Sequence, residues 1–137
     1  MTKNISFTVY GEPSSLKRHR AYRRGQAMIM VDPSKEDKQD FLTQAIKNRP
    51  SKPLSDALKL EVKAFFKRPK SHYNKKGLKT NAPIHCTKIP DADNLLKFVG
   101  DALNAVFWDD DKQITHAVIT KAYSETPRVE VNIEVLL

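Results

Sequence analysis

The clearest helix signal in this chain is the stretch DNLLKFVGDALNAV, residues 93–106. Its apolar residues recur at the spacing i, i+1, i+4, i+7, i+8 and i+11, which forms one stripe along an α-helix. They are Leu95, Leu96, Val99, Ala102, Leu103 and Val106. Asp93, Lys97 and Asp101 share the opposite face. The stretch therefore predicts an amphipathic helix with one buried face and one charged face.

Segments on both sides of this helix predict the rest of the fold. Apolar and polar residues alternate over residues 5–9, 58–65, 114–123 and 129–137, which is typical of half-buried strands. A further helix is expected from Pro33 to just before Pro50, with Asp32 as its cap. We expect an α/β fold in one small domain over residues 1–137. Its mixed sheet should have about four strands and two helices, in the order β-α-β-α-β-β. The last two strands are expected to form a hairpin through residues 124–128.

The charge of the chain is divided unevenly. The 137 residues carry a formal net charge of +8. Residues 1–90 hold 20 Lys/Arg against 7 Asp/Glu, whereas residues 91–137 hold 4 against 9. A basic body predicts an acidic partner, with nucleic acid ahead of an anionic membrane, although a protein can also be basic without such a partner.

Cysteine content and hydropathy indicate the compartment. A single cysteine, Cys86, excludes an internal disulfide and fits a reducing environment. No stretch approaches the roughly 20 apolar residues of a membrane span. We therefore expect a cytoplasmic protein without a membrane partner.

The acidic residues of the second part form two groups. Asp91 and Asp93 flank the start of the predicted helix, and Asp109, Asp110 and Asp111 follow it. Carboxylates at these places can cap a helix or fill a polar turn, and they can also hold a hard cation such as Mg²⁺. The helix is about 20 Å long at 1.5 Å per residue, so a shared site requires the chain to return beside the helix start.

Lys97 and two basic segments are further candidates. Lys97 follows Asp93 by one helical turn, which suits either an ion pair or a cation that stabilises charge on a scissile phosphate. Two long basic segments suit either phosphate binding or a solvated surface. Their candidate DNA-binding residues are Lys17, Arg18, Arg20, Arg23 and Arg24 in the first, and Arg68, Lys70, Lys75 and Lys76 in the second.

Several of these residues lie in segments that resemble a known family. The segments 90–97, 101–104 and 108–114 closely resemble the signature of the RusA-type Holliday junction resolvases. Gly11 and Pro13 with the cations after them, and the segment 68–70, also resemble that family. The resemblance spans nearly the whole chain and is most specific over residues 90–114.

The resemblance implies an activity and roles for the residues. It implies a Mg²⁺-dependent endonuclease, in which Mn²⁺ can substitute, that acts as a homodimer on branched DNA. Paired symmetric nicks would resolve four-way junctions in recombination and repair, often in phage or prophage settings. By position, Asp91, Asp93 and Asp111 match the metal ligands, Asp110 is the alternative acid, and Lys97 matches the essential lysine.

Two other functions use the same residues. One is a metal-dependent nuclease that cleaves other branched DNA or ordinary duplex. The other is a DNA-binding protein without catalysis, which the full set of three acids and a lysine disfavours.

Overall fold

A four-stranded mixed sheet forms the centre of the computed structural model, which describes residues 3–17 and 20–137. Its strands are β1 (Asn4–Tyr10), β4 (Ala57–Lys67), β7 (Ile114–Ser124) and β8 (Arg128–Leu136), in the order β1-β8-β4-β7. β8 is antiparallel to both of its neighbours, and β4 and β7 are parallel. The predicted α/β class and mixed four-stranded sheet are confirmed.

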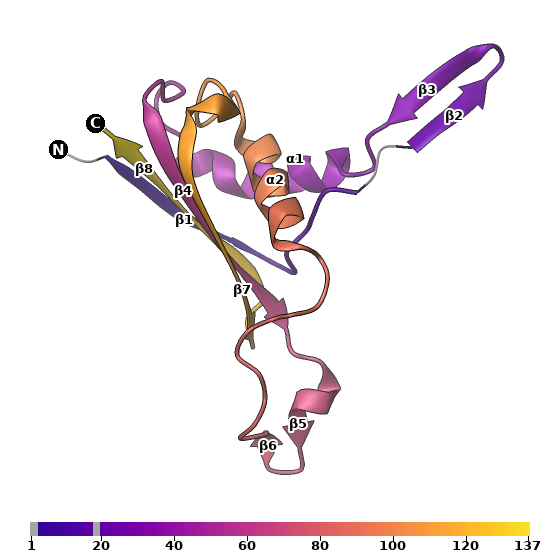
Figure 1. Ribbon diagram of the computed structural model, residues 1–137, viewed down its shortest axis with the longest axis vertical. Helices are drawn as coiled ribbons and strands as arrows, with labels where there is room; N and C mark the ends of the chain where they lie inside the picture. Colours follow the sequence, from indigo (N-terminus) through magenta and orange to yellow (C-terminus); the bar gives the residue numbers. More distant parts are fainter. Residues whose placement is uncertain (1–2, 18–19) are drawn as a thin grey trace.

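Two helices, α1 (Lys35–Ala45) and α2 (Ala92–Leu103), cover one face of this sheet (Figure 1). Every second residue of β4 and β8 is buried, from Leu58 to Phe66 and from Val129 to Val135. The alternate residues on the other face are only half-buried or exposed. Aromatic side chains join the two helices, since the rings of Phe41 in α1 and Phe98 in α2 lie 5.8 Å apart. The hydrophobic core therefore lies between the helices and one face of the sheet.

Both helices differ from their predicted limits. α1 begins at Lys35 because Ser34 occupies the N-cap position, where Asp32 accepts a hydrogen bond from the Ser34 amide at 2.9 Å. α2 ends at Leu103, earlier than predicted, and Ala105 has a left-handed φ of 67°. Its apolar stripe continues into a tight turn, so that Phe107 and Trp108 are fully buried.

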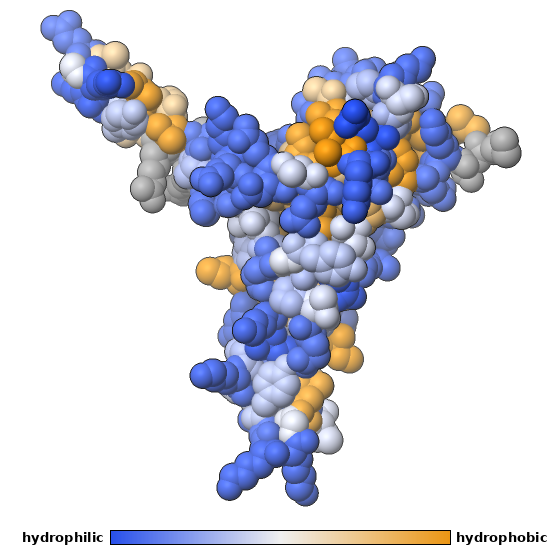
Figure 2. Space-filling model, turned by 180° about the vertical axis from the view of Figure 1, so that it is seen from behind, coloured by the Kyte–Doolittle hydropathy of each residue, from blue (hydrophilic) through white to orange (hydrophobic). Residues whose placement is uncertain are grey.

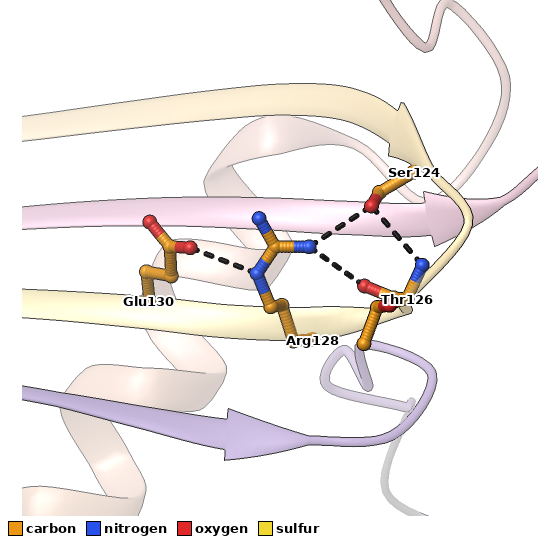
Figure 3. A network of polar contacts seen from close by, with 4 residues as sticks. All are labelled: Ser124, Thr126, Arg128 and Glu130. Carbon is orange, nitrogen blue, oxygen red and sulfur yellow. Dashed lines mark hydrogen bonds and ion pairs between the residues drawn. The ribbon is translucent and has the colours of Figure 1, made fainter.

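The predicted hairpin between the last two strands is wrong. β4 lies between β7 and β8, and the connection at residues 124–128 crosses its end (Figure 3). The Arg128 guanidinium holds this connection by donating to Ser124 Oγ at 2.9 Å and to the Thr126 carbonyl at 2.8 Å. It also donates to Glu130 at 2.8 Å and lies 4.0 Å from the Phe65 ring centroid. The physical reason is burial, because β4 is the most apolar strand of the four-stranded sheet and takes a central place in it.

Two projections leave the body of the domain in different directions (Figure 1). The arm, residues 20–31, is a hairpin of β2 (Arg20–Arg24) and β3 (Ala27–Val31). The tongue, residues 68–88, contains β5 (Tyr73–Asn74) and β6 (Gly77–Leu78). Short 3₁₀ helices complete the chain: η1 (Ile46–Asn48), η2 (Lys70–His72) and η3 (Asp111–Gln113). No helix in the described ranges is long and apolar enough to cross a membrane.

Candidate active site

The head of α2 carries two of the predicted acids. Asp91 occupies the N-cap position and Asp93 lies in the first turn, and both side chains are exposed. In the described structure the Asp91 side chain makes no capping hydrogen bond. Both carboxylates therefore face solvent at the helix end where the backbone dipole favours negative charge. They are available to a cation.

Lys97 lies one turn along the same face of α2. Its Nζ is 4.0 Å from Asp93 Oδ2, and the two side chains are 65% and 69% exposed. An exposed pair at this distance contributes little to stability. Little free energy therefore opposes a movement of the ammonium group toward a phosphate.

The structure distinguishes the three acids of the run 109–111. Asp110 caps η3, because its carboxylate accepts from the Lys112 amide at 3.0 Å and Gln113 Oε1 accepts from the Asp110 amide at 2.8 Å. The exposed Asp109 is held through its backbone amide, which donates to the Leu54 carbonyl at 3.0 Å. Asp110 thus has a structural role as a cap, and its role as a metal ligand stays a prediction.

Asp111 is oriented by a buried aromatic residue. Trp108 Nε1 donates a hydrogen bond to Asp111 Oδ1 at 2.7 Å. Desolvation raises the pKa of the Asp111 carboxyl, the Trp108 hydrogen bond opposes this rise, and nearby Asp101 and Asp110 add to it. A Cβ at Gly100 would lie 3.9 Å from Asp111 Oδ1, so the carboxylate rests against the last turn of α2. Lys97, Gly100, Asp101 and Asp111 share the rim of one depression.

The predicted three-acid site is not assembled within one chain. Gly100, beside Asp111, lies seven residues after Asp93, which is about 10 Å along the helix axis. Among residues 3–17 and 20–137, no three His, Cys, Asp or Glu side chains meet as a metal site. Mg²⁺ often takes only one or two carboxylates, with water and phosphate oxygens as its other ligands. The exposed pair Asp91 and Asp93 fits that donor set, and Asp111 as a third ligand stays a prediction.

Basic residues of the first segment lie on or near the arm. Arg23 and Arg24 are exposed on β2, and Arg20 begins this strand. Lys17 is 62% exposed and pairs with Asp37 at 3.5 Å. Arg18 lies outside the described residues.

Basic residues of the second segment lie on the tongue. Lys70, Lys75 and Lys76 are exposed, and hydrophilic side chains extend from its far end (Figure 2). Arg68 differs from them, because its guanidinium donates to the Pro83 carbonyl at 2.8 Å and lies 5.6 Å from the Tyr123 ring centroid. It holds the base of the tongue, and its predicted part in DNA binding is untested.

Three residues that position the acids were not predicted. Trp108 orients Asp111, and Gly100 gives that carboxylate room. Gln113 Nε2 donates to the carbonyls of Leu54 and Asp56 at 2.8 and 2.9 Å, which anchors the turn. A tryptophan three residues before an acid is the signal that could have identified the first of these contacts.

Comparisons with known proteins agree with the resemblance. Residues 10–134 match the family model described as endodeoxyribonuclease RusA. The matched range includes α2 and both acidic groups. A Bacillus subtilis (strain 168) protein described as uncharacterized protein YqaN is 40% identical over 134 residues, which cover 94% of each chain.

Proposed function

Because this chain belongs to the RusA family of endodeoxyribonucleases, we propose that it is a Mg²⁺-dependent nuclease that resolves four-way DNA junctions. It would act as a homodimer and make paired symmetric nicks in DNA recombination and repair. The observation that carries the proposal is the exposed pair Asp91 and Asp93, with Lys97 one turn away, in a chain whose residues 1–90 are strongly basic. Its place of action would be the cytoplasm, where such DNA lies.

The residues at the head of α2 would divide the chemistry between them. Asp91 and Asp93 would hold Mg²⁺, which supplies polarisation of the scissile phosphate and activation of a water nucleophile. Mn²⁺ offers the same preference for oxygen ligands. The Lys97 ammonium would leave Asp93 and stabilise the charge that develops on the phosphate.

Asp111 is the proposed third ligand. Its carboxylate lies beside Gly100, at the other end of the same helix face. A role in the same site requires the two ends of this face to come closer than they are in one chain. Asp111 would then enter the site with its orientation already set by Trp108.

The basic projections would bring DNA to this acidic face. Carboxylates repel phosphates, so the cations of the arm and the tongue must supply the attraction. α2 lies between the two projections, which leave the domain in different directions (Figure 1). A branched substrate with duplex segments in several directions suits such an arrangement better than a single straight duplex does.

Nicking of a synthetic four-way junction tests the proposal. The wild-type protein and the variants Asp91→Asn and Asp93→Asn would be compared in Mg²⁺ and in EDTA, with product ends mapped on all four strands. We expect wild-type nicks in pairs on opposing strands, and background nicking by both variants. Junction binding by the variants should persist or tighten, since each change removes a negative charge near phosphate.

The controls separate the alternatives. Asp109→Asn makes the same substitution at an exposed aspartate outside the proposed ligand set, and this variant should nick like the wild type. Equal cleavage of linear duplex and junction would favour a nuclease with another substrate. Unchanged nicking by folded Asp91→Asn would refute the assigned site.

A further inference from the structure

The arm is a basic ribbon that stands apart from the core. Residues 20–31 contain Arg20, Arg23 and Arg24 and no Asp or Glu. Its two five-residue strands pair with each other, and the ribbon extends away from the sheet and both helices (Figure 1). Gly25 makes the turn between them with a φ of 63°.

Each face of the arm combines a cation with apolar side chains. The register pairs Ala21 with Met30 and Arg23 with Met28, so Arg23 shares one face with the two methionines. Met28 is 61% exposed and Met30 is 64% exposed. The other face carries Arg24 with the 47% exposed Tyr22. Apolar and hydrophilic groups lie side by side on the ribbon in space-filling view (Figure 2).

This exposure indicates that a partner covers the arm. A two-stranded hairpin is marginally stable at best in water when it packs against nothing else. Two methionines at the same exposed face add apolar surface that favours contact with another molecule. Thioether side chains adapt well to irregular surfaces.

We propose that the arm enters the major groove of duplex DNA, with Arg23 and Arg24 on phosphates and Met28 and Met30 against base edges. The inference rests on the proposed function, because it specifies how the same substrate is held. A major groove about 12 Å wide admits a two-stranded ribbon, whereas a minor groove about 6 Å wide does not. Five-residue strands extend about 17 Å, which is enough to lie along the groove.

Charge selects DNA over a second copy of this chain. The arm carries three arginines and no acidic residue, and another copy of the chain has a net charge of +8, so the net charges of two copies repel. DNA offers phosphates to the arginines and apolar thymine methyl groups to the methionines. The two kinds of side chain on one face therefore match the two kinds of group that line a major groove.

Binding to a labelled 30-base-pair duplex in EDTA tests the apolar contact without involving cleavage. The double variant Met28→Gln/Met30→Gln keeps side-chain length but loses the apolar character, and it should bind about tenfold more weakly. The matched control Met28→Leu/Met30→Leu should bind like the wild type. Neither change should alter the dependence of binding on salt, since no counterion is released by an apolar contact. Arg23→Gln/Arg24→Gln should make the slope of log K against log salt concentration shallower by about 2, because each phosphate contact contributes about 0.9 to that slope.

Methylation of guanine N7 by dimethyl sulfate locates the arm, because this atom lies in the major groove. The wild-type protein should protect guanines that the glutamine variant leaves reactive. Equal binding by the folded glutamine and leucine variants, or unchanged methylation, would overturn the inference. A sedimentation experiment could also overturn the inference. It would do so if the glutamine variant no longer formed a dimer while each protomer bound DNA with unchanged affinity, since the arm would then bind a second copy. If the protein bound duplex DNA through the arm but did not nick junctions, the proposed function would be refuted and the inference about the arm would stand.

Discussion

Replacing Trp108 by phenylalanine should remove the hydrogen bond that orients Asp111 while keeping an aromatic ring in the core. Trp108 is fully buried, and its Nε1 lies 2.7 Å from Asp111 Oδ1. A hydrogen bond to a charged group stabilises a protein by about 1.5–3 kcal/mol when it is buried. The Asp111 carboxylate retains contact with solvent and can be rehydrated, so we expect a coupling of about 1 kcal/mol.

A double-mutant cycle isolates this coupling from the loss of ring packing. Trp108→Phe also shrinks a buried side chain, which should cost about 1–2 kcal/mol of unfolding free energy on its own. The same packing loss occurs in the background Asp111→Ala, so it cancels in the cycle. What remains is the free energy of the interaction between the indole N–H and the carboxylate.

Urea denaturation of the four proteins gives the required free energies, provided that each unfolds in a two-state transition with a similar m-value. The expected result is that Trp108→Phe destabilises the wild type by about 1 kcal/mol more than it destabilises the Asp111→Ala background. A coupling free energy below about 0.3 kcal/mol is what two sites that do not interact would give. That result would refute the assignment of Trp108 as the residue that orients this carboxylate.

Three further predictions concern the acidic face and the tongue. Gly100→Ala should raise the free energy of unfolding in urea by about 0.5–1 kcal/mol, because alanine favours a helix and its Cβ would meet the Asp111 oxygens at an ordinary 3.9 and 4.0 Å; a loss of stability would contradict the described contact. Asp110→Ala should lower the free energy of unfolding by about 1 kcal/mol, because η3 loses its cap. Asp109→Ala should change it by less than about 0.5 kcal/mol, and equal effects of the two changes would refute the capping role. Arg68→Ala should accelerate tryptic cleavage within residues 70–79 and leave the rest of the chain protected, since the guanidinium holds the base of the tongue; an unchanged cleavage rate would exclude that role.

The tongue is joined to the sheet on its return side. The Cys86 amide donates to the Lys121 carbonyl at 3.1 Å, and the Tyr123 amide donates to the Ile84 carbonyl at 3.0 Å. These bonds extend the sheet beside β7 just before the chain enters α2. The base of the tongue is therefore fixed to the sheet a few residues before Asp91.

Local patterns in the sequence were sufficient for much of the fold. The apolar and polar pattern identified all four strands of the sheet, and in β4 and β8 the buried residues recur at every second position, as one buried face requires. The apolar stripe identified α2, and the uneven charge identified a basic body with an acidic face. The resemblance over residues 90–114 named the family, which the match over residues 10–134 confirms.

Tertiary structure alone decided the strand order and the position of Asp111. β4 pairs with both β7 and β8, which are distant from it in the sequence, and alternation within one strand carries no information about its neighbours. Asp111 lies beside Gly100 because the buried Phe107 and Trp108 fold the chain back at the end of α2. Local propensity is set by residues a few positions apart, whereas this placement results from packing of side chains across the whole core. The sequence therefore identified the candidate acids, but only the fold could show which of them lie together.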